Sequence, residues 1–182
     1  MRRHPRSSPR VSCPGYSISS ATEADAVALR HLHAHTWADT YADLLAPEFY
    51  ERRLALHRTR RWDTVILNQQ ASGGDVIVAR SPAGLAGLCQ FGPTEDPDDP
   101  PQKVGHVHRL YVHPSAQRQG VGRSLLAAAT ERLVAPGVWS LTLWALEGDL
   151  RARAFYERLG WRPDGARRDD GATDIRYRLV LS

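Results

Sequence analysis

The chain has 182 residues, of which 42% are hydrophobic, and this is enough for one globular domain with its own core. No apolar run is long enough to cross a bilayer, and the net charge of +4 comes from scattered arginines, so we expect neither a membrane segment nor a nucleic-acid-binding face. The two cysteines, Cys13 and Cys89, form no disulfide framework, and a cytoplasmic protein is expected.

The first fifteen residues are rich in arginine, proline and serine and contain no acidic residue. They lack the apolar centre of a secretory signal. The sequence therefore predicts a disordered basic leader at residues 1–15 and one domain at residues 16–182.

The domain begins with a predicted strand at residues 16–19 and a helix. A capping box at residues 22–25 starts the helix, and Val27, Ala28 and Leu32 are expected to face the core. Pro47 suits the first turn of a second helix, which is predicted to run through Arg61.

The first helix carries histidines at positions 31, 33 and 35. Only His31 and His35, four residues apart, share a face. Two histidines without a third ligand make a poor metal site, so surface histidines are expected.

Two strands at residues 76–80 and 85–91 are predicted to form a hairpin across the turn at residues 81–84. Residues 92–102 contain four prolines and four acidic side chains, which predicts an acidic loop.

A strand, a glycine-containing turn and a helix follow at residues 106–133. The strand at 106–112 ends before Pro114, and the helix shows apolar residues at helical spacing, namely Leu125, Leu126, Ala129 and Leu133. The start of a helix offers backbone N–H groups without intrahelical partners and a partial positive charge. Gly120 and Gly122 permit close approach of an anion, and Arg118 and Arg123 add charge, so a diphosphate group is the expected ligand.

Two nucleotide-binding motifs do not fit this turn. A P-loop needs Gly-Lys before Ser or Thr, whereas Gly122 is followed by Arg123 and Ser124. A dinucleotide fingerprint needs a third glycine at the position of Leu125.

The remaining elements complete one sheet. A strand at residues 139–146 precedes a helix that Asp149 can cap and Gly160 can end, and alternating apolar residues predict a closing strand at 175–181. Antiparallel hairpins with a central strand–helix–strand crossover predict an α+β domain with a central mixed β-sheet flanked by helices.

Three motifs together resemble the GNAT family of N-acetyltransferases. The pattern Gln/Arg-x-x-Gly-x-Gly/Ala is matched by Gln117, Gly120 and Gly122, the run from Leu110 to Pro114 resembles the family's fourth strand, and Phe155 to Trp161 resembles its closing helix and strand. The resemblance runs from about residue 16 to residue 181. It implies a single GNAT domain and an N-acetyltransferase that uses acetyl-CoA as co-substrate and no metal.

The resemblance also implies which residues bind coenzyme A. They are the end of the fourth strand, the turn and the helix starts, namely Leu110, Tyr111, Val112, Gln117, Arg118, Gln119, Gly120, Val121, Gly122, Arg123, Ser124 and Asp149. Many relatives have asparagine where this chain has Asp149, which can cap the helix but cannot donate to a cofactor carbonyl. Arg151 and Arg153 are candidate partners of the ribose 3′-phosphate.

The expected catalytic residues are two histidines and a tyrosine. Alternation places His106 and His108 on the same strand face as Leu110 and Val112, and a histidine can take a proton from an amine near neutral pH. Zinc binding is the alternative role for these two histidines, but a zinc site would need a third ligand, and the sequence offers none beside them. The resemblance implies that Tyr156 protonates the departing thiolate.

The acyl acceptor is expected to be a small-molecule primary amine rather than a protein N-terminus. The resemblance places the first two helices at the acceptor pocket, with Trp37 and Tyr41 as candidate contacts, and the acidic loop favours a cationic acceptor. A coenzyme-A-binding module without transferase activity is the alternative, and a homodimer is left open.

Overall fold

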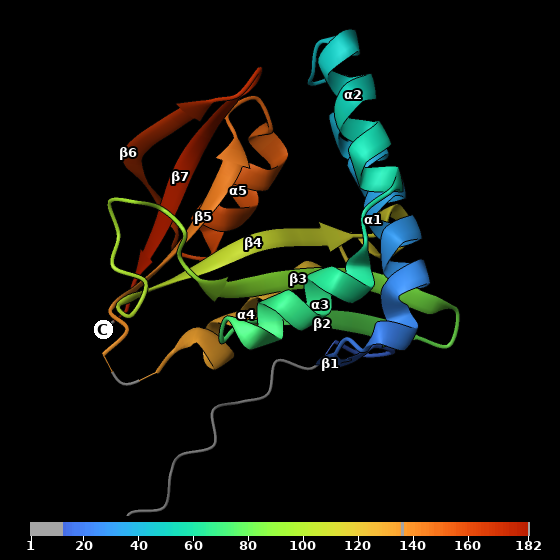
Figure 1. The fold of residues 1–182 in the computed structure, drawn as a ribbon, viewed down its shortest axis with the longest axis horizontal. Coiled ribbons are helices and arrows are strands. Elements are labelled where there is room, and N and C mark those ends of the chain that lie inside the picture. Colours follow the sequence, from blue (N-terminus) through green and yellow to red (C-terminus); the bar gives the residue numbers. More distant parts are fainter. Residues whose placement is uncertain (1–12, 136, 182) are drawn as a thin grey trace, which may run out of the picture.

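A mixed seven-stranded sheet is the centre of the structure, a computed structural model that describes residues 13–135 and 137–181 (Figure 1). Its strand order is β1-β2-β3-β4-β5-β7-β6, and within the described residues all neighbours are antiparallel except β4 and β5. The strands are β1 (Ser17–Ser20), β2 (Asp75–Ser81), β3 (Gly84–Pro93), β4 (Val104–Val112), β5 (Ser140–Leu146), β6 (Arg162–Asp169) and β7 (Thr173–Val180).

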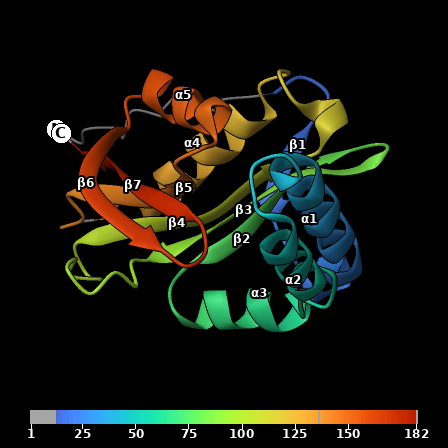
Figure 2. The same cartoon turned by 90° about the horizontal axis from the view of Figure 1, so that it is seen from above.

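Helices cover both faces of this sheet (Figure 2). They are α1 (Ala26–Tyr41), α2 (Pro47–Arg58), α3 (Trp62–Ala71), α4 (Val121–Leu133) and α5 (Leu150–Arg158). The side chains of β2 alternate between two cores, with Val76 and Val78 packed against α1 and α3, and Ile77 and Ala79 packed on the α4 side. The predicted α+β fold with one mixed sheet is therefore confirmed.

The part of the chain before β1 is only partly described. Most of the predicted leader, residues 1–12, lies outside the described residues. Cys13 is described and is buried against the α4 side of the sheet, so the packed region begins earlier than the predicted boundary at residue 15. Among the described residues, no helix combines the length and apolar character that crossing a membrane requires.

Two predictions about the helices are wrong. The second helix ends at Arg58, and a separate helix, α3, follows it with Trp62 and Ile66 buried four residues apart. In α1, Val27 and Ala28 are exposed, and Leu29 faces the core together with the predicted Leu32.

Strand β4 separates from β5 halfway along its length. The parallel pairing runs from Val104 opposite Ser140 to Val107 opposite Leu143 and stops there. Figure 1 shows the two strands diverging beyond this point. The second half of β4 therefore keeps β3 as its neighbour on one edge and has no strand on the other.

A bulge sits where this separation begins. Arg109 pairs with Gln90 and Val107 pairs with Phe91, so His108 is an extra residue in β4. As a result Val107 packs in the same core as Leu110 and Val112. The prediction that His106 shares a face with those two residues is therefore wrong, because simple alternation does not pass through a bulge.

A buried arginine joins the acidic loop to the sheet. The Arg176 side chain is 6% exposed and forms ion pairs with four aspartates, namely Asp96, Asp98, Asp99 and Asp164. Arg178 pairs with Asp99 and Asp164. The acidity of the predicted loop is therefore largely neutralised within the protein.

We predict that Arg176→Met destabilises the fold by about 3–5 kcal/mol, because it leaves buried carboxylates without their partner. The measurement is the free energy of unfolding in urea at pH 7. Arg167→Met is the matched control, since Arg167 forms an exposed pair with Glu147 and its loss should change little. Equal decreases in the free energy of unfolding of the two variants would contradict the role given to the buried network of Arg176.

Candidate functional site

The turn before α4 has the backbone shape of an anion-binding loop. Arg118 and Gly120 both have positive φ angles, 61° and 87°, and Gly120 is the N-cap of α4. In the described part of the chain, the amides of residues 118–123 have no backbone acceptor. Free amides at a helix start can bind an anionic group without side-chain help.

Hydrogen bonds to three other segments hold this turn in place. Gln117 Nε2 donates to the carbonyl oxygen of Val112, and Arg151 of α5 donates to Gln117 Oε1. Cys13 Sγ donates to the carbonyl oxygen of Gln119 at 3.0 Å, and the Tyr16 hydroxyl donates to Gln119 Oε1 at 2.9 Å. The last two contacts were not predicted, because they join residues more than 100 positions apart.

The first turn of α4 lies against the end of β4 and against α5. A Cβ atom at Gly122 would lie 3.4 Å from Val112 Cγ2 and 3.6 Å from Phe155 Cζ. Val121 and Ser124 are buried, whereas Arg118, Gln119 and Arg123 are exposed. The charged side chains of the turn therefore lie in solvent, next to amides that have no backbone acceptor among the described residues.

Three tyrosines from different elements lie near enough to one another to affect each other's pKa. Tyr156 of α5 has its pKa raised by burial and by the nearby Cys89 and Tyr111. Burial also raises the pKa of Tyr41 of α1, whose side chain contacts that of Tyr111. All three hydroxyl groups therefore keep their protons at neutral pH.

The two predicted catalytic histidines lie next to each other but in different surroundings. Their ring centroids are 4.9 Å apart. His106 is 7% exposed and its Nδ1 lies 2.8 Å from Thr142 Oγ1, and burial lowers its pKa to about 3. His108 is only half-buried, and burial lowers its pKa by less than it lowers that of His106.

Helices α1 and α2 contribute a second aromatic group. Trp37 is 5% exposed and packs on His57 at 4.6 Å between ring centroids, so it belongs to the packing between the helices. His33 is fully buried and lies 4.8 Å from the Tyr111 ring. Burial of His33 corrects the expectation of surface histidines, which holds for His31 and His35.

Helix α5 starts as predicted. Asp149 Oδ1 accepts a hydrogen bond from the Ala152 amide, which confirms the cap. Arg153 donates to the Tyr177 hydroxyl and to the Glu147 carbonyl oxygen, so its guanidinium is already engaged, whereas Arg151 reaches the anion-binding loop.

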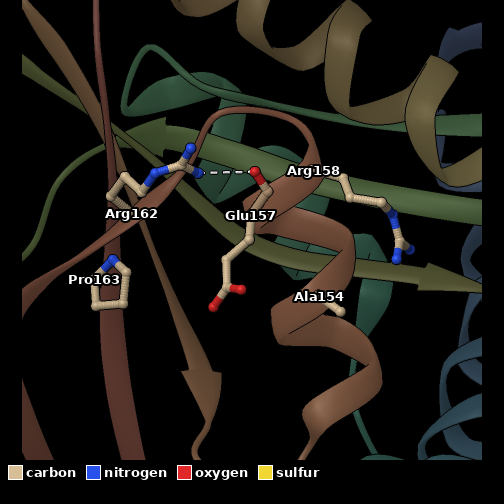
Figure 3. Close-up of a pocket in the computed structure, with 5 residues that line it drawn as sticks. All are labelled: Ala154, Glu157, Arg158, Arg162 and Pro163. Carbon is tan, nitrogen blue, oxygen red and sulfur yellow. Dashed lines mark hydrogen bonds between the residues drawn. The ribbon is translucent and has the colours of Figure 1, made fainter.

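A shallow pocket lies beside α5 and β6, and its walls are Ala154, Glu157, Arg158, Arg162 and Pro163 (Figure 3). Arg162 Nη1 donates to the Glu157 carbonyl oxygen across it. The pocket includes none of the predicted site residues. Elsewhere in residues 13–135 and 137–181, no group of three His, Cys, Asp or Glu side chains is placed to hold a metal ion.

Comparison with known proteins identifies the family. The model of the acetyltransferase (GNAT) family matches residues 27–161. The chain belongs to the GNAT family. This N-acetyltransferase is 25% identical over 132 residues to the uncharacterized N-acetyltransferase YuaI of Bacillus subtilis, and the match covers 72% of each chain.

Solved structures share the GNAT fold. The paiA N-acetyltransferase from Thermoplasma acidophilum, solved in complex with coenzyme A, has a TM-score of 0.73 and 17% identity, covering 90% of this chain and 99% of its own. The structure of yncA from Salmonella typhimurium with its cofactor acetyl-CoA has a TM-score of 0.67 and 21% identity, covering 92% and 95%.

We predict that Gly120→Ala destabilises this GNAT domain by about 1–2 kcal/mol, because a left-handed backbone brings a Cβ atom too close to the next carbonyl oxygen. Gly148→Ala is the matched control, since Gly148 has open space around it and no positive φ. The measurement is urea unfolding of both variants. A loss of equal size at Gly148 would show that the backbone angle of Gly120 is not the cause.

Proposed function

We propose that this enzyme transfers an acetyl group from acetyl-CoA directly to a small primary amine. The observation that carries the proposal is the set of free amides at residues 118–123, placed where β4 has left β5. The GNAT relatives solved with coenzyme A and acetyl-CoA support it.

The residues around the point where β4 separates from β5 are suited to binding coenzyme A. The free amides of Gly120 to Arg123 would bind the pyrophosphate, with Arg118, Arg123 and Arg151 supplying charge around them. The Ser124 amide already donates to the Gly120 carbonyl oxygen, so Ser124 could contribute only through its side chain. The backbone of Leu110 to Val112, which faces no strand on the β5 side, would bind the pantetheine arm. Asp149 caps α5 beside this region, and an amide near Val112 would polarise the thioester oxygen.

Acetyl-CoA supplies an acetyl group activated as a thioester, and the protein must supply a neutral amine. Alkyl amines are mostly ammonium ions at neutral pH, so a base has to remove a proton. His108 suits this role better than His106. Its Nε2 is buried and has no partner among the described residues, whereas His106 lies within hydrogen-bond distance of Thr142 and burial lowers its pKa to about 3.

Tyr156 would deliver a proton to the departing thiolate. Its raised pKa keeps the hydroxyl protonated through the neutral range, so a proton is available when the thiolate forms. Tyr41 lies close to Tyr111 and remains our proposed acceptor contact, while Trp37 would shape the pocket through packing.

Neither cysteine suits a covalent acyl intermediate. Cys89 is completely buried and burial raises its pKa, while Cys13 uses its thiol in the contact with Gln119. Direct transfer is therefore favoured over a two-step route. Two free cysteines also suit a reducing compartment, and we propose the cytoplasm.

The contact between α2 and the β6–β7 hairpin favours a small-molecule acceptor over a protein N-terminus. Gly171 at the tip of the hairpin packs directly on the Phe49 ring, where an added Cβ would come within 2.6 Å. Arg53 Nη1 lies 3.7 Å from Asp170 Oδ2 across the same contact. This contact between α2 and the hairpin narrows the path by which an acceptor reaches the region between the two halves of the sheet.

The test is thiol release from acetyl-CoA with amines, amino acids and N-terminal peptides as acceptors. Calorimetry with acetyl-CoA alone measures binding independently of turnover. Binding without thiol release for any acceptor would support a coenzyme-A-binding module, and absence of binding would overturn the proposal.

We predict that His108→Gln lowers kcat by about 100-fold, the usual contribution of a positioned base. In the wild type, kcat should fall as pH decreases, with an inflection below pH 6.5, because the lowered pKa of His108 keeps it neutral until then. The variant should lose this inflection. His106→Gln is the comparison, and an inflection lost only in His106→Gln would reverse the assignment.

We predict that Tyr156→Phe lowers kcat by about 100-fold while the KM for acetyl-CoA changes little, because the proton donor is lost and the ring is kept. Stopped assays of thiol release measure both constants. Tyr50→Phe is the matched control, since the Tyr50 hydroxyl donates to the Ala38 carbonyl oxygen within the helix pair. Full turnover by Tyr156→Phe would exclude Tyr156 as the acid.

A further inference from the structure

Three arginines gather on the acceptor side of the sheet, and we call Arg53, Arg60 and Arg109 the arginine cluster. Arg53 lies on α2, Arg60 lies just after α2, and Arg109 follows the bulge in β4. Burial and the charge of Arg60 lower the pKa of Arg109 to about 10. Burial, together with the charge of Arg53, lowers the pKa of Arg60, so the three guanidinium groups act on one another.

The cluster lacks matching negative charge. Within residues 13–135 and 137–181, neither Arg60 nor Arg109 forms an ion pair, and the one pair of Arg53 is with Asp170, whose side chain is 86% exposed. Arg60 Nε is buried without a hydrogen-bond partner. Glu95 is the carboxylate that acts on Arg109, and it does so from beyond ion-pair distance.

Three arginines elsewhere in the described residues are paired with carboxylates. Arg80 is paired with Asp25, Arg132 with Asp75, and Arg176 with four aspartates. Uncompensated positive charge that is partly removed from water is unfavourable unless something binds there. The contrast indicates that the cluster is kept for a ligand.

The side chains around the cluster cannot compensate its charge. His33 and His57 lie between α1, α2 and β4, and burial holds their pKa values at about 2 and 4, so both are neutral. The arginines lower these values further. Arg109 Nη1 donates to the side-chain oxygen of Gln90, which is neutral and leaves the charge uncompensated. Tyr111 is a further neighbour, and it links the cluster to Tyr41 and so to the proposed site.

We propose that the amine acceptor also carries an acidic group, a carboxylate or a phosphate, which the arginine cluster binds. This inference rests on the proposed function, because it describes the acceptor of the same reaction. Three of the four carboxylates of the acidic loop are not available to a cationic acceptor, since Asp96, Asp98 and Asp99 are all paired with Arg176 or Arg178.

Binding the acid at the cluster would also help the chemistry. The C–N bond forms as the C–S bond breaks, the amine loses a proton to the base, and the thiolate gains one. Positive charge near the amine favours its neutral form, which is the nucleophile. One group of side chains thereby selects the acceptor and activates it.

The test compares acceptors that differ only in the acidic group. Thiol release is measured with amino acids and their amides, with aminoalkyl phosphates and the matching amino alcohols, and with a polyamine. We expect kcat/KM for the acids to exceed that for the neutral partners at least tenfold. Whichever series has the higher kcat/KM, the carboxylates or the phosphates, identifies the acidic group.

Arg60→Gln and Arg109→Gln should remove this preference by raising the KM of the acid at least tenfold, while turnover of the neutral partner is kept. Arg58→Gln is the matched control, because Arg58 is an exposed arginine at the end of α2, two residues before Arg60. Calorimetry of the full-length enzyme with each acid alone gives a readout independent of turnover. Binding should be lost in the cluster variants and kept in Arg58→Gln.

Faster turnover of amides or the polyamine would overturn the acidic acceptor while leaving acetyl transfer intact. Absence of thiol release with every amine would instead contradict the proposed function. In that case calorimetry still decides the inference, because acids that bind the wild type and the Arg60→Gln variant equally would contradict the cluster.

Discussion

The separation of β4 from β5 is the constraint on which the rest of the structure depends. Beyond Val107 and Leu143 the two strands no longer share hydrogen bonds, yet each keeps its antiparallel neighbour, β3 or β7. An unpaired strand edge inside a sheet is a binding surface for an extended chain. The α4 amides at the end of this edge add an anion site, so a long ligand with a phosphate at one end suits both features.

The distribution of charge divides the protein into a structural and a functional region. Around Arg176, carboxylates and guanidinium groups neutralise one another and fix the acidic loop to the sheet. Around Arg109, positive charge is partly buried without an acidic partner within ion-pair distance. Ion pairing therefore stabilises one region, and the other is the region where we propose that an anion binds.

The sequence predicts those parts of the structure that depend on local signals. The cap at Asp149, the turn before α4 and the apolar face of α4 follow from residues within one or two turns of each other. The bulge at His108 was not predicted, because it depends on the register against β3. The arginine cluster was also missed, since its members come from segments about 50 residues apart, and only the fold brings them together.

The contacts of Cys13 and Tyr16 with Gln119 have a consequence for how the protein assembles. The thiol of Cys13 meets a carbonyl 106 positions further along the chain. Contacts over such separations carry a large loop-closure cost and form slowly. We therefore expect the turn before α4 to reach its final shape late during folding, after the segment that contains Cys13 and Tyr16 has docked beside it. Newly made enzyme would then become compact before it gains its full affinity for the ligand proposed to bind there.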